Sequence, residues 1–229
     1  TYVRIHKFFH TRCFGEVALK GVGEHRLYEV TGLKGIFDND LRVDDNSIMA
    51  KKYSFLEEEI KTKIKQLFPK LDMLNIESKD GSFNHSLAVS IFAVALKREL
   101  NLKIDENKLI TAACAHDLGK IYIKSSVLNK EEISNEVRDV IKNIGDLSEK
   151  VIKKIGNHES IIPLIKEMHS DEVNISQEAR ILRISDSFDS LIFPKYYIVE
   201  TKSLLEAEDI LKVNFPFSET DVFLNLIKP

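Results

Sequence analysis

The chain has 229 residues, of which 43% are hydrophobic and 30% charged, and its formal net charge is −3. This composition predicts a globular protein with one large domain, or one domain with an appendage, and a sizeable core. The slightly acidic balance excludes a strongly basic surface for duplex nucleic acid, and no apolar run approaches the about 18 residues of a membrane span.

The start of the chain and its cysteines indicate a cytoplasmic protein. The first residues, TYVRIHK, lack the apolar segment of a signal peptide. Cys13 and Cys114 are far apart and form no CxxC motif, so we expect free thiols in a reducing compartment. Because the chain does not begin with methionine, we expect Thr1 to be an internal residue of a longer polypeptide with other domains.

Residues 1–31 differ in pattern from the rest and predict a short β-hairpin appendage. Residues 15–30 indicate two short strands joined by a turn that contains glycine. Their sequence, GEVALKGVGEHRLYEV, resembles the ending of class III nucleotide cyclase domains, G-E-x-x-L-K-G-x-x-E-x-x-x-Y-x-V. The cyclase metal-binding aspartates are not in this chain, so the resemblance implies a cyclase-like domain upstream in a parent protein and no cyclase activity here.

Residues 32–54 are rich in Gly, Asp and Asn and predict a linker. Residues 55–229 predict a mainly α domain, in which Asp105 and Ser176 are candidate helix N-caps. Its helices are expected at about residues 55–68, 83–99, 106–117, 131–143, 146–156, 160–168, 176–192, 202–212 and 218–227.

The most informative run is ACAHDLGK at residues 113–120. The apolar residues 109–115 predict a buried helix that leads directly to His116 and Asp117. Because aspartate is rarely buried without a partner, the pair suggests a bound divalent cation. The alternative is an ordinary helix C-terminus, where His116 and Lys120 favour the negative end of the dipole and a glycine ends the helix. These residues alone leave both interpretations open.

A metal ion needs about four ligands, so further candidates must come from other helices. His85 begins an apolar helical stretch, and Asp186 interrupts the mostly apolar residues 179–191. Each alone is readily explained as a satisfied polar side chain. The order His, His-Asp, Asp on successive helices favours a shared metal site.

These residues resemble the H…HD…D pattern of the HD superfamily of metal-dependent phosphohydrolases. The closer resemblance is to the HD-GYP branch, which is associated with cyclic dinucleotide hydrolysis. Residues 115–130, AHDLGKIYIKSSVLNK, resemble its segment HDIGK-I-x-I-P-x-x-I-L-N-K, and residues 178–191, EARILRISDSFDSL, resemble its helix EARIL-x-x-x-D-x-F-D-A-L. The resemblance runs from about residue 80 to the C-terminus and implies an HD-domain helical bundle. It implies that the metal ligands are His85, His116, Asp117 and Asp186.

The resemblance also implies the chemistry of the site. The ion, which the sequence does not identify among Fe, Mn, Zn, Mg and Ni, would polarise a phosphoryl oxygen and supply hydroxide at neutral pH. Asp117 and Lys120 are the expected catalytic residues, with Lys120 as a positive point charge toward phosphate. The alternative for Lys120 is a solvated cation at a helix end. Asp189, three residues after Asp186, would lie on the same helix face and either orient ligands or cap a neighbouring element.

The chain departs from the HD-GYP pattern at the second metal. Asn143 and Asn157 occupy positions where the branch has histidines, and no Gly-Tyr-Pro motif lies between residues 159 and 178. A second ion would retain only Asp117 and His158 as ligands. His158 is expected to be a ligand or a phosphate contact, with a partly buried surface histidine as the alternative. His169 is expected at the surface, without a role.

We expect a metal-binding phosphohydrolase domain of the phosphodiesterase type in bacterial nucleotide second-messenger signalling, acting on a nucleotide or another phosphoester. The alternative is a catalytically inactive HD-fold module that regulates a multidomain cyclase-like signalling protein. A third interpretation is protein binding through the apolar residues 161–165, which core packing explains equally well. The sequence leaves open whether the chain is an active enzyme and whether it forms a homodimer.

Overall fold

The structure is a computed structural model. It describes residues 9–19, 23–33, 55–68, 82–122, 143–172, 174–192 and 202–227. The predicted linker therefore lies almost entirely outside the described residues, as does the predicted helix at 131–143 except for Asn143. None of the described helices is long and apolar enough to cross a membrane.

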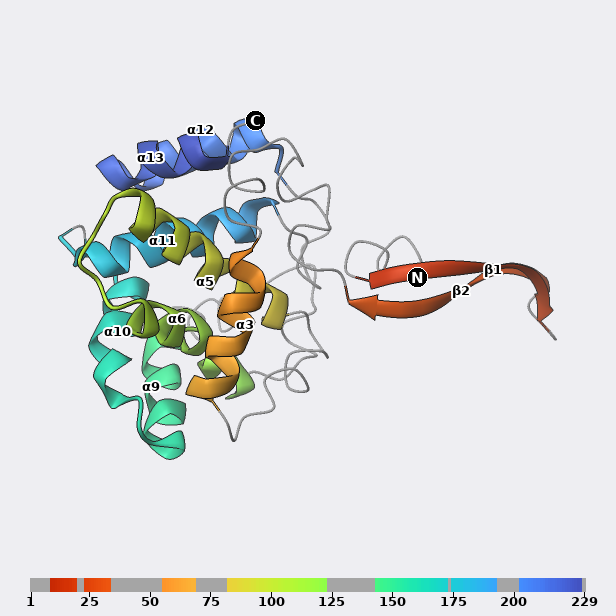
Figure 1. Ribbon diagram of the computed structural model, residues 1–229, viewed down its shortest axis with the longest axis horizontal. Helices are drawn as coiled ribbons and strands as arrows, with labels where there is room; N and C mark the ends of the chain where they lie inside the picture. Colours follow the sequence, from red (N-terminus) through yellow and green to blue (C-terminus); the bar gives the residue numbers. More distant parts are fainter. Residues whose placement is uncertain are drawn as a thin grey trace.

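Two strands, β1 (Phe9–Leu19) and β2 (Gly23–Leu33), pair antiparallel near the N-terminus (Figure 1). The register slips between Cys13 and Gly15, where Gly15 has a φ of 97°. Glycine tolerates this left-handed conformation, which is typical of a β-bulge. The strands extend beyond the predicted appendage limit at residue 31. The appendage as a unit that resembles a cyclase ending stays a prediction.

The rest of the described chain is helical, which confirms the mainly α fold class. The helices are α3 (Leu56–Leu67), α5 (Ser82–Glu99), α6 (Glu106–Ala115), η1 (Leu118–Tyr122), α9 (Ile144–Ile155), η2 (Glu159–Ile161), α10 (Ile162–His169), α11 (Gln177–Ile192), α12 (Leu204–Asn214) and α13 (Ser218–Ile227). The helix predicted over 106–117 ends at Ala115, and a 3-10 helix follows it. Both predicted caps are confirmed, because Asp105 Oδ1 accepts from the Asn107 amide at 2.9 Å and Ser176 Oγ accepts from the Ala179 amide at 3.3 Å.

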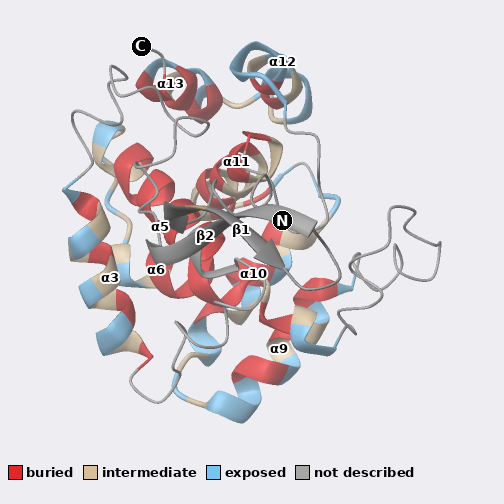
Figure 2. Cartoon of the chain, turned by 90° about the vertical axis from the view of Figure 1, so that its right-hand side faces the viewer, coloured by how far each residue is buried: buried red, intermediate tan, exposed pale blue. Residues whose placement is uncertain are grey.

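Helix α5 forms the centre of the bundle and packs against α6, α11, α3 and α13. Residues 87–96 of α5 are all buried, as Figure 2 shows for the middle of the body, because this helix is apolar nearly all round. Phe92, Phe188 and Phe223 meet edge to face with ring centroids 5.1 to 5.8 Å apart. Each such pair contributes about 0.5–1.5 kcal/mol beyond area burial, so this triad ties α5 to α11 and α13.

The apolar residues 161–165 also belong to the core. Ile161, Leu164 and Ile165 are buried, and Ile162 packs against the core from the side. Core packing therefore accounts for most of this run, and protein binding through it stays a prediction.

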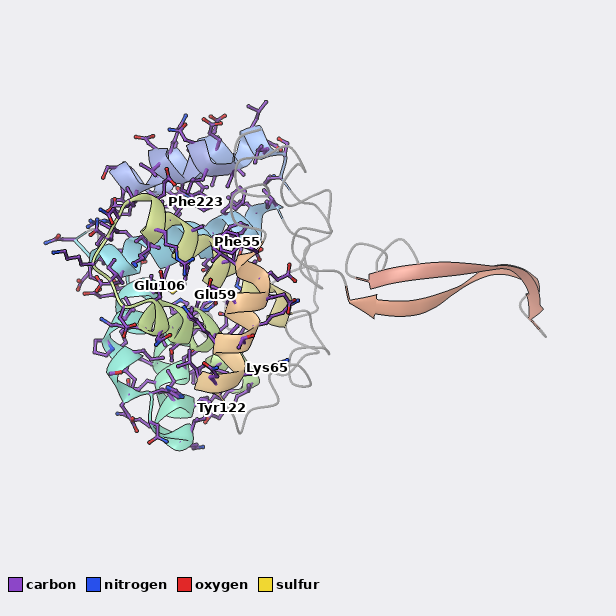
Figure 3. The ribbon with its side chains drawn as sticks, in the orientation of Figure 1. Phe55, Glu59, Lys65, Glu106, Tyr122 and Phe223 are labelled. Carbon is purple, nitrogen blue, oxygen red and sulfur yellow. The ribbon has the colours of Figure 1, made fainter. Side chains whose placement is uncertain are left out.

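A charged cluster joins α3, α5 and α6 on the outside of the bundle (Figure 3). Arg98 donates from Nε and Nη2 to the two carboxylate oxygens of Glu106, each at 2.8 Å, and Nη2 also reaches Glu59 at 3.0 Å. Lys63 adds a bond to Glu106 at 3.2 Å. Arg98 lowers the pKa of Glu106 to about 2, although burial opposes the shift.

Replacing Glu106 by Gln should lower the free energy of unfolding at pH 7 by about 1–2 kcal/mol, since a charged bidentate bond is lost. The folded pKa lies below the unfolded one, so this stabilisation is present above about pH 4.5 and disappears as the pH falls toward 2. Urea unfolding across this range should show the difference between wild type and variant narrowing with acidity. Glu58→Gln removes an exposed pairing with Lys61 inside α3 and should change stability much less. An equal loss of unfolding free energy in both variants would show that the bonds between Arg98 and Glu106 do not stabilise the fold.

Gly119 allows η1 to approach the start of α9. A Cβ at Gly119 would lie 2.7 Å from Ile144 O and 2.8 Å from Ser148 N. The Gly119 amide donates to Ser148 Oγ at 2.9 Å, and that hydroxyl donates to the His116 carbonyl oxygen at 2.7 Å. The turn that follows α6 is thus fixed against the backbone of α9.

Gly119→Ala should therefore destabilise the protein by about 1–3 kcal/mol, because backbone atoms must move apart. Thermal unfolding measures the loss. Gly145→Ala is the matched control, since its Cβ would meet His169 Cβ at an ordinary 3.4 Å. Wild-type stability of Gly119→Ala would show that the close approach is not required.

Candidate metal centre

Three helices meet where α5 begins, α6 ends and α11 passes its middle. His85 lies in the first turn of α5, and His116 is the C-cap residue directly after α6. Asp186 projects from α11, which packs against both other helices. His85 and His116 are only 4% and 1% exposed. The apolar faces of these helices therefore bring polar side chains from distant parts of the sequence to one buried point.

The side chains converge closely. His85 Nε2 lies 3.1 Å from Asp186 Oδ1, and His116 Nε2 lies 3.7 Å from the same oxygen. Ligand atoms of these three residues all lie within 4.8 Å of one another, and they are the metal-type cluster found among the described residues. Around an ion with bonds of about 2.0–2.1 Å, neighbouring ligand atoms are about 3.0–3.4 Å apart. The observed spacing therefore fits a shared cation.

Hydrogen bonds at Nδ1 turn Nε2 of both histidines toward this point. His116 Nδ1 is 2.7 Å from the Ala113 carbonyl oxygen, which can only accept, so Nδ1 carries the proton. His85 Nδ1 is 2.6 Å from Asp189 Oδ2, a carboxylate that accepts in the same way. With Nδ1 held in this way, Nε2 is the atom of each ring that can take either a proton or a metal ion.

Both Nε2 atoms are buried without a hydrogen-bond partner in the part of the chain that the structure describes. A lone pair that faces a carboxylate oxygen is unfavourable unless a positive charge lies between them, and buried polar atoms without partners are rare. The nitrogen and oxygen set suits zinc, iron, manganese or nickel. The residues present therefore fit a divalent cation.

Asp117 and Lys120 lie beside this cluster. Asp117 Oδ2 is 3.4 Å from His116 Nε2 and 3.6 Å from His85 Nε2. Lys120 Nζ, one turn later, forms an ion pair with the same oxygen. Burial opposes ionisation of Asp117, but His116 and Lys120 hold its pKa well below its usual range. Asp117 and Lys120 thus place a carboxylate and a cationic side chain at the edge of the site.

The charges favour a cation at the centre. Burial would lower the pKa of His116, but Asp117 and Asp186 outweigh it and raise this pKa to about 10. The pKa of Asp186 is held well below its usual range, against burial, by His116 and His85. A proton and a metal ion compete for such a nitrogen, so the carboxylates that favour protonation of His116 also favour a divalent ion.

Asp189 is the orienting residue that the sequence left undecided. It is fully buried one turn after Asp186 on α11, and His85 bridges the two carboxylates with its two ring nitrogens. The spacing of three residues was the signal for it, but its partner on α5 depended on helix packing.

His169 was expected at the surface, and this expectation is wrong. It lies partly buried at the end of α10, and its ring stands nearly parallel to that of His116, with centroids 5.9 Å apart. Burial, reinforced by the charge of His116, lowers the pKa of His169. No signal in the sequence around His169 indicated that this side chain lies beside His116, because its charged neighbours are typical of an exposed segment.

His158 lies outside the cluster of three ligands. Its ring centroid is 4.6 Å from that of Phe68, at the end of α3. Asn143 lies directly before α9, and Asn157 adopts a φ of 67° in the turn after it. A metal-binding role for His158 stays a prediction.

Asp189→Asn should weaken binding of Mn²⁺ or Zn²⁺ about 10–100-fold, because a neutral amide makes the His85 ring less basic and orients it less firmly. Isothermal titration after chelator treatment measures the affinity. Asp209→Asn, at an exposed position on α12, is the matched control and should bind as wild type. Unchanged affinity in Asp189→Asn would show that this carboxylate does not support the site.

Comparison with known proteins agrees with this geometry. Residues 82–191 match the family model of the HD domain. The matched segment runs from the start of α5 almost to the end of α11, so it includes all four residues of the H…HD…D pattern. No curated protein and no solved structure matches the chain significantly. The match shows that residues 82–191 are similar to the HD domain, as the H…HD…D pattern indicated.

Proposed function

We propose that this chain is a metal-dependent phosphohydrolase of the phosphodiesterase type that acts on a nucleotide or a related phosphoester. The observation that carries the proposal is the pair of buried Nε2 atoms, on His85 and His116, that face Asp186 without hydrogen-bond partners. The HD domain match over the same residues supports it.

The residues divide into two roles. His85, His116 and Asp186 would hold the ion, with Asp117 as a fourth ligand beside them. A bound divalent ion supplies Lewis acidity toward a phosphoryl oxygen and a hydroxide at neutral pH. Lys120, whose ammonium group lies against Asp117, provides positive charge for a phosphate oxygen at the rim.

The finer proposal is an HD-GYP-like domain in bacterial second-messenger signalling, located in the cytoplasm within a longer cyclase-like protein. It rests on the two segments that resemble that branch. Asparagines at positions 143 and 157 favour a single strongly held ion, because an amide is a poorer ligand than imidazole for a transition metal.

The same asparagines favour a second candidate, a catalytically inactive HD module that binds metal or nucleotide and regulates neighbouring domains. A two-ion site stabilises both the attacking and the leaving oxygen. A domain reduced to one ion keeps only part of that advantage.

The metal content and phosphodiesterase activity of the purified chain test the proposal. We expect about one divalent ion per chain and hydrolysis of bis(p-nitrophenyl) phosphate or a cyclic dinucleotide, with both lost in His116→Ala. Loss of a metal ligand should reduce turnover at least about 100-fold. Asp221→Asn on α13, an exposed carboxylate, should retain both.

The outcomes separate the two candidates. A bound ion without turnover of any phosphoester would favour the regulatory module. A wild-type chain that takes up no metal at micromolar concentrations would contradict the enzyme proposal.

A further inference from the structure

Helix α10 reaches the metal centre through its last residue. His169 Nε2 lies 3.2 Å from the carbonyl oxygen of His116. The two imidazole rings are inclined by 18°, so they lie nearly parallel. His169 thus contacts both the backbone and the ring of a proposed ligand, although it is not within the cluster of ligand atoms.

The His116 carbonyl oxygen receives two hydrogen bonds from different helices. Ser148 Oγ of α9 donates at 2.7 Å and His169 Nε2 of α10 at 3.2 Å. These bonds occur where α6 has ended, so this carbonyl needs partners from outside its own helix. They fix the peptide between His116 and Asp117, and with it the directions of both side chains.

The end of α10 is itself anchored to α11. Arg183 Nε donates to the Met168 carbonyl oxygen at 2.8 Å, and its Nη2 donates to the Glu167 carbonyl oxygen at 2.7 Å and to that of Ser170. A guanidinium with several fixed donors suits the unpaired carbonyls at a helix C-terminus. Because Arg183 and Asp186 share α11, the same helix positions one ligand directly and His116 indirectly.

We infer that His169 is a positioning residue of the metal centre, which holds the His116-Asp117 peptide by a hydrogen bond from Nε2 and thereby sets metal affinity. The inference rests on the proposed function, because it assumes that His116 binds an ion. His169 itself does not touch the ion. Ligand orientation within about 0.5 Å commonly depends on such supporting contacts.

Substitutions separate the hydrogen bond from the ring. His169→Gln keeps an N–H donor at a similar distance from the backbone and removes the aromatic ring, whereas His169→Phe keeps a ring and removes the donor. His169→Ala removes both. Asp209→Asn, at an exposed position on α12, is the control, because it leaves the end of α10 and its contacts with Arg183 unchanged.

The probe is Co²⁺ alone, titrated into the chelator-treated full chain and followed by its visible absorption. Supporting residues of metal ligands are worth about 10–100-fold in affinity. We expect Ala and Phe variants to lose about that much and to shift the cobalt absorption bands. The Gln variant should regain most of the affinity, and Asp209→Asn should match wild type. Circular dichroism in chelator checks that each variant is folded.

The results distinguish this inference from the proposed function. Wild-type protein that shows no cobalt bands would overturn both. Cobalt binding by wild type with equal affinity in His169→Ala would overturn the positioning role alone. Rescue by Phe and not by Gln would also overturn it, because ring packing and not the hydrogen bond would then be the cause.

Discussion

Two imidazoles and two carboxylates face one another where three helices meet, and the packing of the helical body holds them in contact. The ring nitrogens of His85 and His116 point at carboxylate oxygens 3.1 to 3.7 Å away. Because both imidazoles are buried, such an arrangement is costly unless a positive charge is present. The surrounding core compensates by burying apolar side chains from α5, α6 and α11. The cluster is thus held in place by packing that does not depend on the charges themselves.

The second constraint is the closeness of backbones beside the cluster. Helix α6 ends at Ala115 with His116 as its C-cap, and the following turn is held against the body by contacts with α9. Gly119 has no side chain to separate η1 from α9, and Ser148 bonds to both His116 and Gly119. This contact directs Asp117 toward the two imidazoles and puts Lys120 at its edge. The HDLGK run therefore combines ligands, charge and close packing in five residues.

The proposed single-ion character follows from where the chain departs from the HD-GYP pattern. His158 packs on Phe68, and Asn157 occupies a left-handed turn. The interval that lacks Gly-Tyr-Pro contains helix α10. Its apolar residues are buried in the core, and its last residue, His169, contacts the His116 carbonyl oxygen. The candidate metal cluster of His85, His116 and Asp186 is therefore held by several helices, whereas the predicted second site keeps fewer imidazoles.

The sequence by itself determined the helical class, most helix bounds and the order His, His-Asp, Asp. These features are local, since they depend on apolar periodicity, on caps such as Asp105, and on residue types with metal-ligand chemistry. Only the tertiary structure decided that Asp189 meets His85, that His169 meets His116, and that His158 lies against Phe68. Those contacts join residues more than 50 positions apart, and no periodicity within one helix specifies which face of another helix it will meet. Packing of the apolar faces makes that choice, and the polar side chains then take the positions that packing leaves to them.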